Sequence, residues 1–150
     1  MQRTFLLLTI GTILILAGCD SIAERVEDRF GSVSPKSEIF VGDQAAVGAA
    51  VLSAFKRLDF TVNSSREGGA IEASSAIRRS EALGDSRQLV ATVRLLDAGP
   101  GKTEVQILLT EQVEGSTPAG GGEQPQREHG FYGTFFSTVR QVLTEERTPH

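Results

Sequence analysis

Residues 87–109 read RQLVATVRLLDAGPGKTEVQILL, and this stretch decides the fold. Every second residue from Leu89 to Leu95 is apolar, and Thr92 and Arg94 lie between them. Two glycines and a proline in residues 97–102 are typical of a tight turn. The alternation then resumes, with apolar residues at positions 105, 107 and 109 on one face and Glu104, Gln106 and Leu108 on the other. The stretch therefore predicts an antiparallel hairpin with one buried face.

Further strands precede this hairpin. Apolar and polar residues alternate over 60–63, and Gly68-Gly69 then signals a turn. A returning strand follows, in which four residues share one face: Ile71, Ala73, Ser75 and Ile77. These strands and the hairpin predict a four-stranded meander, and residues 38–41 predict one more short strand. Residues 79–86 are interpreted as a loop.

Two segments change to helical spacing. Asp43 can cap a helix over residues 44–58, whose apolar residues recur at steps of three and four: Val47, Val51, Ala54, Phe55 and Leu58. A C-terminal helix is indicated by the apolar stripe of Tyr132, Phe135, Phe136, Val139, Val142 and Leu143. Such stripes must be covered, and the open face of the sheet is the available partner. We therefore expect an α+β two-layer domain, with two helices on one face of an antiparallel sheet of four to five strands.

Composition and charge limit the classes of function. The chain has 150 residues, of which 39% are hydrophobic and 23% charged, as is typical of one globular domain. We expect a single domain over residues 38–147, within which residues 115–130, rich in Gly, Pro, Gln and Glu, form a flexible loop. The net charge of -4 argues against nucleic acid as a partner.

The N-terminus reads MQRTFLLLTIGTILILAGC over residues 1–19. Arg3 provides a short positive region, and every residue from Phe5 to Ala17 is apolar or small and uncharged. As a helix this stretch would be about 20 Å long, which is too short for a hydrocarbon core of about 30 Å. Its length and charge are those of a secretory signal peptide.

Leu16-Ala17-Gly18-Cys19 resembles the lipobox of bacterial lipoproteins, in which an aliphatic residue and two small residues precede a cysteine. The resemblance implies cleavage between Gly18 and Cys19, so that residues 1–18 are a removed signal peptide and Cys19 is the acylated first residue of the mature chain. It also implies a lipid-anchored domain at the cell envelope, facing the periplasm. In enteric members, Asp at the position of Asp20 favours the inner membrane. The alternative is a buried cysteine at the end of a hydrophobic helix.

Residues 19–37 predict the anchor, a short helix and a linker. Ser21 and Glu24 have the spacing of a capping box, and Ile22, Val26 and Phe30 fall on one helical face. Residues 32–37 are interpreted as the linker. After cleavage the chain would carry 14 basic and 19 acidic residues, a net charge of -5. With Cys19 acylated, no thiol would remain for a disulfide, so packing alone would stabilise the fold.

The mature sequence is similar in element order to small envelope lipoproteins. Over residues 38–147 it loosely resembles the helix-grip domains of BamC, a lipoprotein of the outer-membrane assembly machinery. The order strand, helix, four-stranded meander and helix carries this resemblance, and no residue motif accompanies it. The resemblance implies a fold and assigns no functional residue.

Gly99-Pro100-Gly101-Lys102-Thr103 contains the Gly-Lys-Thr sequence of phosphate-binding loops. Such a loop needs a glycine where this chain has Leu96, and a helix directly after the motif. Residues 104–109 alternate like a strand instead. The interpretation that the residues favour is a hairpin turn.

The remaining polar groups predict no catalytic residue, metal site or cofactor. His129 and His150 are too few for a zinc site, and no Gly-x-Ser-x-Gly motif accompanies Ser137. The acidic pairs Glu111/Glu114 and Glu145/Glu146 lack the aromatic platforms usual in sugar sites, and Glu128 beside His129 is typical of a solvated loop. A small basic cluster at one end of the meander is predicted from Arg78, Arg79 and Arg87.

The function expected from the sequence is non-catalytic. We expect a membrane-anchored periplasmic lipoprotein that binds an envelope protein or supports envelope assembly, with an exposed meander edge or the loop 115–130 as its contact surface. The alternative is a carrier of lipid or of a small molecule, with a cavity between the helices and the sheet. An enzyme would need polar side chains that converge in a cleft.

Overall fold

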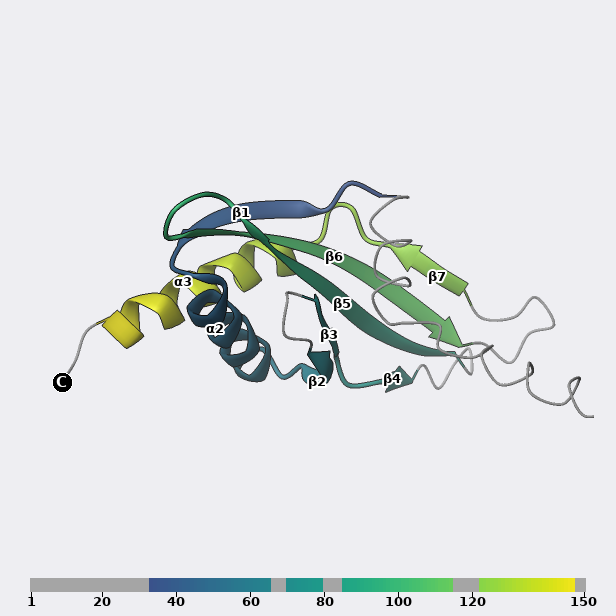
Figure 1. Ribbon diagram of the computed structural model, residues 1–150. Helices are drawn as coiled ribbons and strands as arrows, with labels where there is room; N and C mark the ends of the chain where they lie inside the picture. The colour runs from purple at the N-terminus through teal and green to yellow at the C-terminus, as the bar shows by residue number, and fades with distance from the viewer. Residues whose placement is uncertain (1–32, 66–69, 80–84, 115–121, 148–150) are drawn as a thin grey trace, which may run out of the picture.

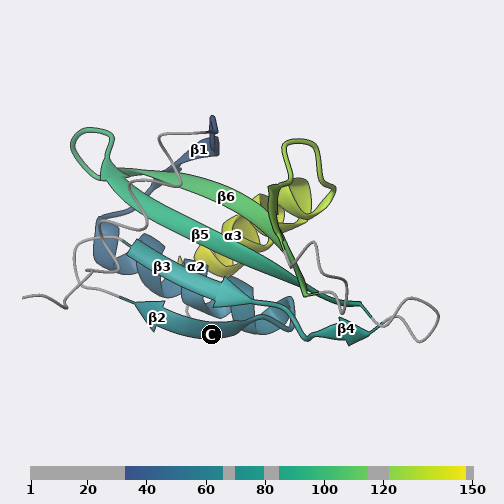
Figure 2. The same cartoon turned by 90° about the vertical axis from the view of Figure 1, so that its right-hand side faces the viewer.

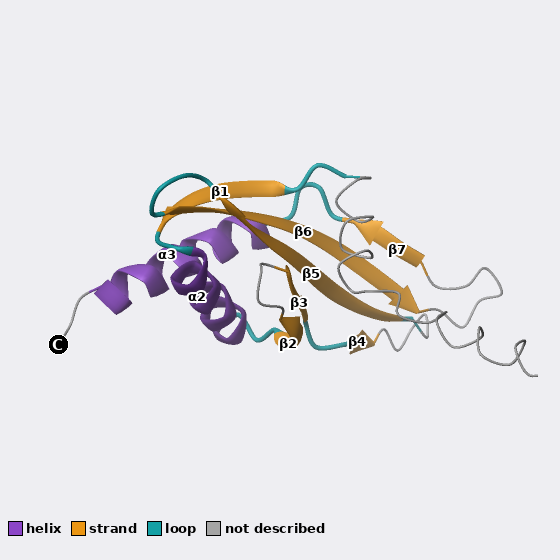
Figure 3. Ribbon diagram, viewed as in Figure 1, coloured by secondary structure: helices purple, strands orange, loops and turns teal. Residues whose placement is uncertain are grey.

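The computed structural model describes residues 33–65, 70–79, 85–114 and 122–147. It confirms a two-layer α+β fold, in which one face of an antiparallel sheet carries two helices, α2 (Gln44–Arg57) and α3 (Phe131–Arg147) (Figures 1 and 3). Seven strands are described: β1 (Lys36–Val41), β2 (Thr61–Ser65), β3 (Ala70–Ser74), β4 (Arg78–Arg79), β5 (Ser86–Asp97), β6 (Lys102–Glu114) and β7 (Gly122–Pro125).

The central element is the hairpin of β5 and β6, in which residues 86–97 lie opposite residues 103–114. In the turn that connects β5 to β6, Gly99 and Gly101 have φ angles of 106° and 65°. Glycine adopts such positive φ angles without steric cost. The Asp97 carboxylate accepts a hydrogen bond from the Gly99 N–H at 2.8 Å. The predicted hairpin is confirmed, because the chain continues from this turn directly into β6 and not into the helix that a phosphate loop requires.

The strand order is β1-β6-β5-β3-β2, and two short strands pair at the far end of the hairpin, β4 with β5 and β7 with β6. The predicted meander of β2, β3, β5 and β6 is confirmed, and β1 lies beside β6. The prediction of four to five strands missed β4 and β7, because two arginines and the sequence GEQP show no apolar alternation. Strand β7 falls inside the predicted loop 115–130, and Lys36 and Ser37 of the predicted linker belong to β1.

Helix α2 begins at the predicted cap. The Asp43 Oδ1 atom accepts a hydrogen bond from the Ala46 N–H at 2.8 Å. The last turn carries Lys56 and Arg57, where positive charge is favourable to the helix dipole. Five residues of the helix are buried: Val47, Ala50, Val51, Ala54 and Phe55. The helix therefore turns its predicted apolar face to the core.

The apolar stripe of α3 is buried along its whole length, as predicted: Tyr132, Phe135, Phe136, Val139, Val142 and Leu143. The Phe135 ring lies 5.1 Å from the Phe55 ring of α2, and the Phe136 ring lies 6.3 Å from the Phe40 ring of β1, measured between centroids. Both helices and the inner face of the sheet share one apolar cluster. In Figure 2 the sheet lies in front and both helices lie behind it.

Three apolar residues differ in burial from the prediction of one buried face: Ile77, and Val90 and Leu108 of the outer face. Ile77 is 58% exposed, because β3 ends at Ser74 and the chain has left the inner face of the sheet. Leu108 faces away from the helices, as expected, but it is only 2% exposed. It lies opposite Thr92, which is also buried. The outer face therefore has a buried centre and is not uniformly polar.

The Tyr132 hydroxyl joins α3 to the sheet. It accepts a hydrogen bond from the Leu109 N–H at 3.0 Å and donates one to the Gln126 carbonyl at 2.6 Å. The Gln126 N–H in turn donates to the Leu109 carbonyl at 2.8 Å. The hydroxyl thus lies between two backbone groups at the end of the β6–β7 ladder. Burial raises the pKa of the Tyr132 hydroxyl above its ordinary value.

Replacing Tyr132 by Phe keeps the ring in the core and removes this hydroxyl. We expect the free energy of unfolding to fall by about 1–3 kcal/mol, because a buried N–H and a carbonyl lose their common partner. Equilibrium urea unfolding of the full chain measures the change. Thr138→Val, which removes a hydroxyl that bonds within α3 itself, is the control and should change stability by no more than about 0.5 kcal/mol. An unchanged urea midpoint of unfolding for Tyr132→Phe would contradict the stabilising role of the hydroxyl between α3 and the sheet.

The raised pKa of Tyr132 also predicts a dependence on alkaline pH. In the unfolded chain this hydroxyl ionises near pH 10, whereas in the folded chain it keeps its proton to a higher pH. Above about pH 10 the unfolded state therefore binds fewer protons, and stability falls as pH rises. Urea unfolding between about pH 9 and pH 11 should show a shallower fall in Tyr132→Phe than in the parent chain. Parallel curves for the two proteins would show that the raised pKa has no effect on stability.

Candidate functional site

The residues on which the lipoprotein prediction depends, Gly18, Cys19 and Asp20, lie outside the described residues, as does His150. Val33 is the first residue that the structure describes, and β1 begins at Lys36. The Lys36 Nζ atom lies 2.7 Å from Glu128 Oε1, so an ion pair joins the start of β1 to the connection before α3. Neither described helix is long and apolar enough to cross a membrane.

A groove of about 220 Å³ lies between the terminal strand β1 and α3. Residues 38–41 of β1 line one side of it, and Arg140, Leu143 and Thr144 of α3 line the other. Phe40 and Leu143 are buried against the core, whereas Ile39 and Val41 are 59% and 60% exposed. We call this feature the β1 groove. It presents two exposed β-branched side chains beside the charged pair of Glu38 and Arg140.

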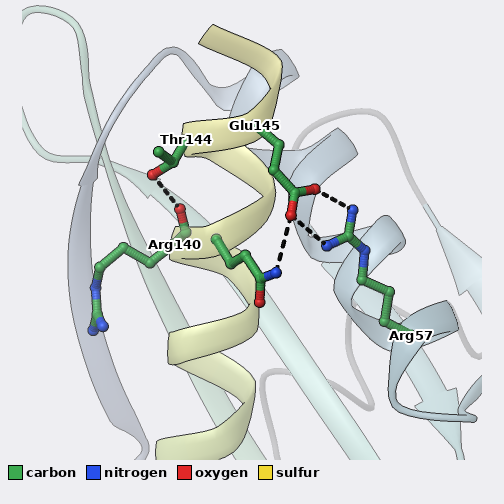
Figure 4. Close-up of polar contacts among 5 residues, drawn as sticks. Arg57, Arg140, Thr144 and Glu145 are labelled. Carbon is green, nitrogen blue, oxygen red and sulfur yellow. Dashed lines mark hydrogen bonds and ion pairs between the residues drawn. The ribbon is translucent and has the colours of Figure 1, made fainter. Parts of the chain in front are cut away.

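Ion pairs on two sides of α3 fix the wall of the β1 groove. The Arg140 Nη2 atom lies 2.7 Å from Glu38 Oε1 and so joins α3 to β1. The Glu145 carboxylate accepts hydrogen bonds from Arg57 of α2 at 2.6 and 3.3 Å, and from Gln141 at 2.9 Å. Figure 4 shows Arg57 and Arg140 on opposite sides of the α3 ribbon. The helix is therefore held between β1 and α2 by charges as well as by its apolar stripe.

The Arg57–Glu145 contact shifts the pKa of both groups. The hydrogen bond from Arg57 is the main cause that lowers the pKa of the Glu145 carboxyl, with Gln141 second. The same hydrogen bond raises the pKa of Arg57. Both shifts move away from neutral pH, where general acids and bases titrate. The arrangement thus favours a structural tie between the helices.

A second cleft, of about 530 Å³, lies where the β5–β6 turn meets the start of α2. Asp43, Asp97 and the turn residues 99–102 are among its lining. The Gly42 N–H donates to the Gly101 carbonyl at 2.8 Å, so the turn is bonded to the segment before α2. Two carboxylates beside a helix N-terminus are unfavourable for phosphate, which is itself negative. The geometry agrees with the interpretation of this motif as a turn.

Each polar residue considered for catalysis has a separate structural place. His129 Nδ1 accepts a hydrogen bond from the Phe131 N–H at 3.1 Å, at the start of α3. Glu128 is paired with Lys36, and Ser137 is exposed on α3, about two turns further along. Within the described ranges, no group of three His, Cys, Asp or Glu side chains is placed to hold a metal ion.

The predicted arginine cluster lies at the N-terminal end of β5. Arg78 lies opposite Arg87 in the β4–β5 register, and Arg79 lies next to this pair. All three side chains are exposed. The Arg87 Nη1 atom lies 3.7 Å from Glu111 Oε1, and Glu114 lies opposite Ser86. Acidic groups therefore offset part of the positive charge at this end of the sheet.

The sequence did not predict the β1 groove. Residues 38–41 read EIFV, so apolar side chains occur on both faces and the alternation does not show which face is buried. In the structure Phe40 points to the core, and Ile39 and Val41 point away from it. One signal was present: Glu38 shares the inner face with Phe40, where it meets Arg140 at 2.7 Å. Recognising it requires knowledge of where α3 lies.

Comparisons with known proteins place the chain in no family. No protein-family model matches it, and no curated protein sequence matches it. One similar solved structure is the adenylate sensor from AMP-activated protein kinase in complex with 5-aminoimidazole-4-carboxamide 1-β-D-ribofuranotide. That match has 12% sequence identity, covers 71% of this chain and 94% of the other, and has a TM-score of 0.41. A likeness at this level carries no argument about ligand or function.

Glu145→Gln tests the tie between α2 and α3. Because the folded-state pKa of Glu145 lies below its ordinary value of 4.5, its contribution to stability is present above that pH and is lost as pH falls through the folded-state pKa. Thermal unfolding between about pH 3 and pH 7 should show a shallower acid decline in Glu145→Gln than in the parent chain. Glu146→Gln removes the same charge one residue away and is the matched control. Identical profiles for the two variants would contradict a specific role for Glu145.

Proposed function

We propose that this chain is a lipid-anchored protein of the bacterial cell envelope, whose domain faces the periplasm and binds other proteins without catalysing a reaction. The observation that carries the proposal is Leu16-Ala17-Gly18-Cys19, placed after Arg3 and the uncharged stretch from Phe5. The apolar stretch enters a membrane, the small residues fit a cleavage site and the thiol accepts an acyl group. Two or three acyl chains anchor a protein stably, at about 0.8 kcal/mol per buried methylene.

The anchor would act by local concentration. A tethered domain is confined to a thin layer at the membrane, which raises its rate of encounter with neighbouring proteins. Asp20, directly after the acylated residue, favours the inner membrane by its similarity to enteric lipoproteins. The envelope protein that binds the domain would meet it within this layer.

The arrangement of the domain supports binding over catalysis. Its ionisable candidates are engaged in contacts that hold elements together, as Glu145 is with Arg57 and Glu128 is with Lys36. By contrast, the β1 groove offers exposed apolar side chains at a terminal strand. Exposed apolar side chains of this kind are suited to contact with another protein.

The alternative of a lipid or small-molecule carrier has less support. Such a function needs a cavity between the helices and the sheet, and aromatic rings occupy much of that layer. The Phe60 ring lies 4.7 Å from Phe131, and Phe135 lies 5.5 Å from Phe136. Rings at such distances are in direct contact. Mass spectrometry of the purified protein would favour a carrier if a small ligand co-purified with it.

Labelling with [³H]palmitate in growing bacteria tests the anchor. The parent chain should incorporate label and fractionate with the membrane, whereas Cys19→Ala should do neither, because it lacks the thiol that is acylated. Ser21→Ala, two residues away, is the matched control and should behave like the parent chain. Label retained in Cys19→Ala would refute the assignment, and so would a native protein that begins at Met1 and carries no added fatty mass.

Chemical crosslinking in intact cells tests the proposal that the domain binds protein. We expect the tagged parent chain to form discrete adducts with envelope proteins, because the anchor confines both to one layer. The Cys19→Ala variant should form fewer of them. Failure to recover any adduct, under conditions that recover known lipoprotein complexes, would contradict an interaction module.

A further inference from the structure

We propose that residues 21–30, which the sequence predicts as a short helix, pack against the outer face of the sheet, opposite α2 and α3. The sheet would then have helical cover on both faces. This inference rests on the proposed function at one point: removal of the signal peptide leaves residues 19–32 as the chain that precedes the described domain. The other observations that support it come from the described strands and from the sequence.

Two apolar side chains of the outer face are as buried as the core but do not belong to it. Val90 and Leu108 are 3% and 2% exposed, and neither is part of the apolar cluster that the helices share with the inner face. Successive side chains of a strand point to opposite faces. Thr92 lies opposite Leu108 and Thr110 lies opposite Val90, and both threonines are buried as well. We call these four residues the outer patch.

The described helices do not account for this burial. In the part of the chain that the structure describes, both helices lie on the inner face, behind the sheet in Figure 2. An antiparallel sheet with one face on the core commonly has its other face in water and polar. Buried apolar side chains at the centre of the second face are therefore typical of a sheet that is covered on both sides.

The chain before β1 enters the domain beside the outer patch. Lys36 lies opposite Ile107 in the register of β1 with β6, so continuing this register by one residue places Pro35 beside Leu108. Residues 32–35 span up to about 13 Å when extended. That length allows the segment that ends at Gly31 to lie across the patch.

The apolar stripe of residues 21–30 matches the outer patch in length. Ile22, Val26 and Phe30 recur every four residues, so on a helix they form one stripe about 12 Å long. Val90 and Leu108 are diagonal neighbours on adjacent strands, and such residues lie about 7–8 Å apart. A helix of ten residues is marginally stable by itself. Burial of its stripe on the patch would stabilise it.

The shorter ranges outside the described residues offer no comparable stripe. Residues 66–69, 80–84, 115–121 and 148–150 contain one large apolar side chain, Leu83. Leu83 belongs to the connection between β4 and β5, and this connection returns to the sheet at Ser86, four residues before Val90. Leu108 lies opposite Thr92, two residues further along β5. One leucine at that end of the strand does not cover both apolar residues of the patch.

This packing would fix the orientation of the domain at the membrane. As a free tether, residues 19–32 would reach up to about 45 Å, and any face of the domain could approach the lipid. With residues 21–30 on the outer patch, only Asp20 separates them from the acylated Cys19. The outer face of the sheet would then lie next to the membrane, and α2 and α3 would face the periplasm.

The reactivity of a thiol in the outer patch tests the packing. Leu108→Cys is introduced into the full chain, the protein is extracted from membranes in a mild detergent, and its rate of reaction with a maleimide is measured. Adding Val26→Lys places a charge in the apolar stripe and should raise this rate at least about tenfold, because the segment then leaves the patch more often. Asp28→Lys, on the opposite side of the predicted helix, is the matched control and should leave the rate unchanged.

Three results of this experiment would overturn the proposal. An unchanged rate in Val26→Lys would show that neighbouring side chains of the sheet cover the patch by themselves. Protection present in membranes but lost in detergent would assign the patch to lipid, and protection that falls on dilution would assign it to a second copy. Ile77→Cys, at an exposed position, gives the rate of an unprotected thiol, and the parent chain gives any background from Cys19.

Trypsin cleavage tests the same packing without a substitution in the sheet. Cleavage after Arg29 should be slow in the parent chain, and Ile22→Ser should accelerate it by about tenfold or more, because the stripe loses a buried side chain. Cleavage after Arg79, which is exposed, should be equally fast in both proteins. Equal rates after Arg29 would overturn the proposal. Failure of the anchor appears instead as unlabelled Cys19 in the palmitate experiment, so the two outcomes are distinguishable.

Discussion

The rest of the structure depends on the burial of one face of the β5–β6 hairpin under two helices. Strands β5 and β6 have 12 and 13 residues, which corresponds to about 40 Å at 3.3 Å per residue. Helix α2 has 14 residues, or about 21 Å at 1.5 Å per residue. The hairpin is therefore about twice as long as the helix that it packs against. Its far end extends beyond α2, and there the short strands β4 and β7 pair with it.

The length of the hairpin also explains which parts of the fold could be predicted from the sequence. Where helices cover the sheet, burial imposes alternation on the strands and a stripe on each helix. The sequence therefore predicted the helix cap at Asp43, the turn at Gly99 and the six buried residues of the α3 stripe. Beyond the helices, β4 and β7 are held by backbone pairing and β7 also by a hydrogen bond from Gln112 to Glu123. Backbone pairing leaves no pattern in side chains. Ile77 was misplaced for the same reason, since the alternation of β3 continues in the sequence after the strand has ended.

The β1 groove was beyond sequence reasoning because two different elements make it. EIFV has apolar side chains on both faces, and only the position of α3 decides which face is buried. That position is set by contacts distant in sequence: Tyr132 with Leu109, Arg140 with Glu38, and Glu145 with Arg57. None of these pairs belongs to a motif, because each partner is chosen by the tertiary fold. The lipobox has the opposite character, since its four residues are contiguous and are recognised without any fold.

The register shift between Val62 and Ser64 in β2 has a consequence for solubility. A regular, apolar strand at the side of a sheet offers a template on which other chains can aggregate. Strand β2 departs from that form, because its pairing with β3 is interrupted and its exposed residues Thr61, Asn63 and Ser65 are polar. A bulge also increases the local twist of a strand. A small irregularity at this side of the described sheet thus disfavours aggregation of the folded chain.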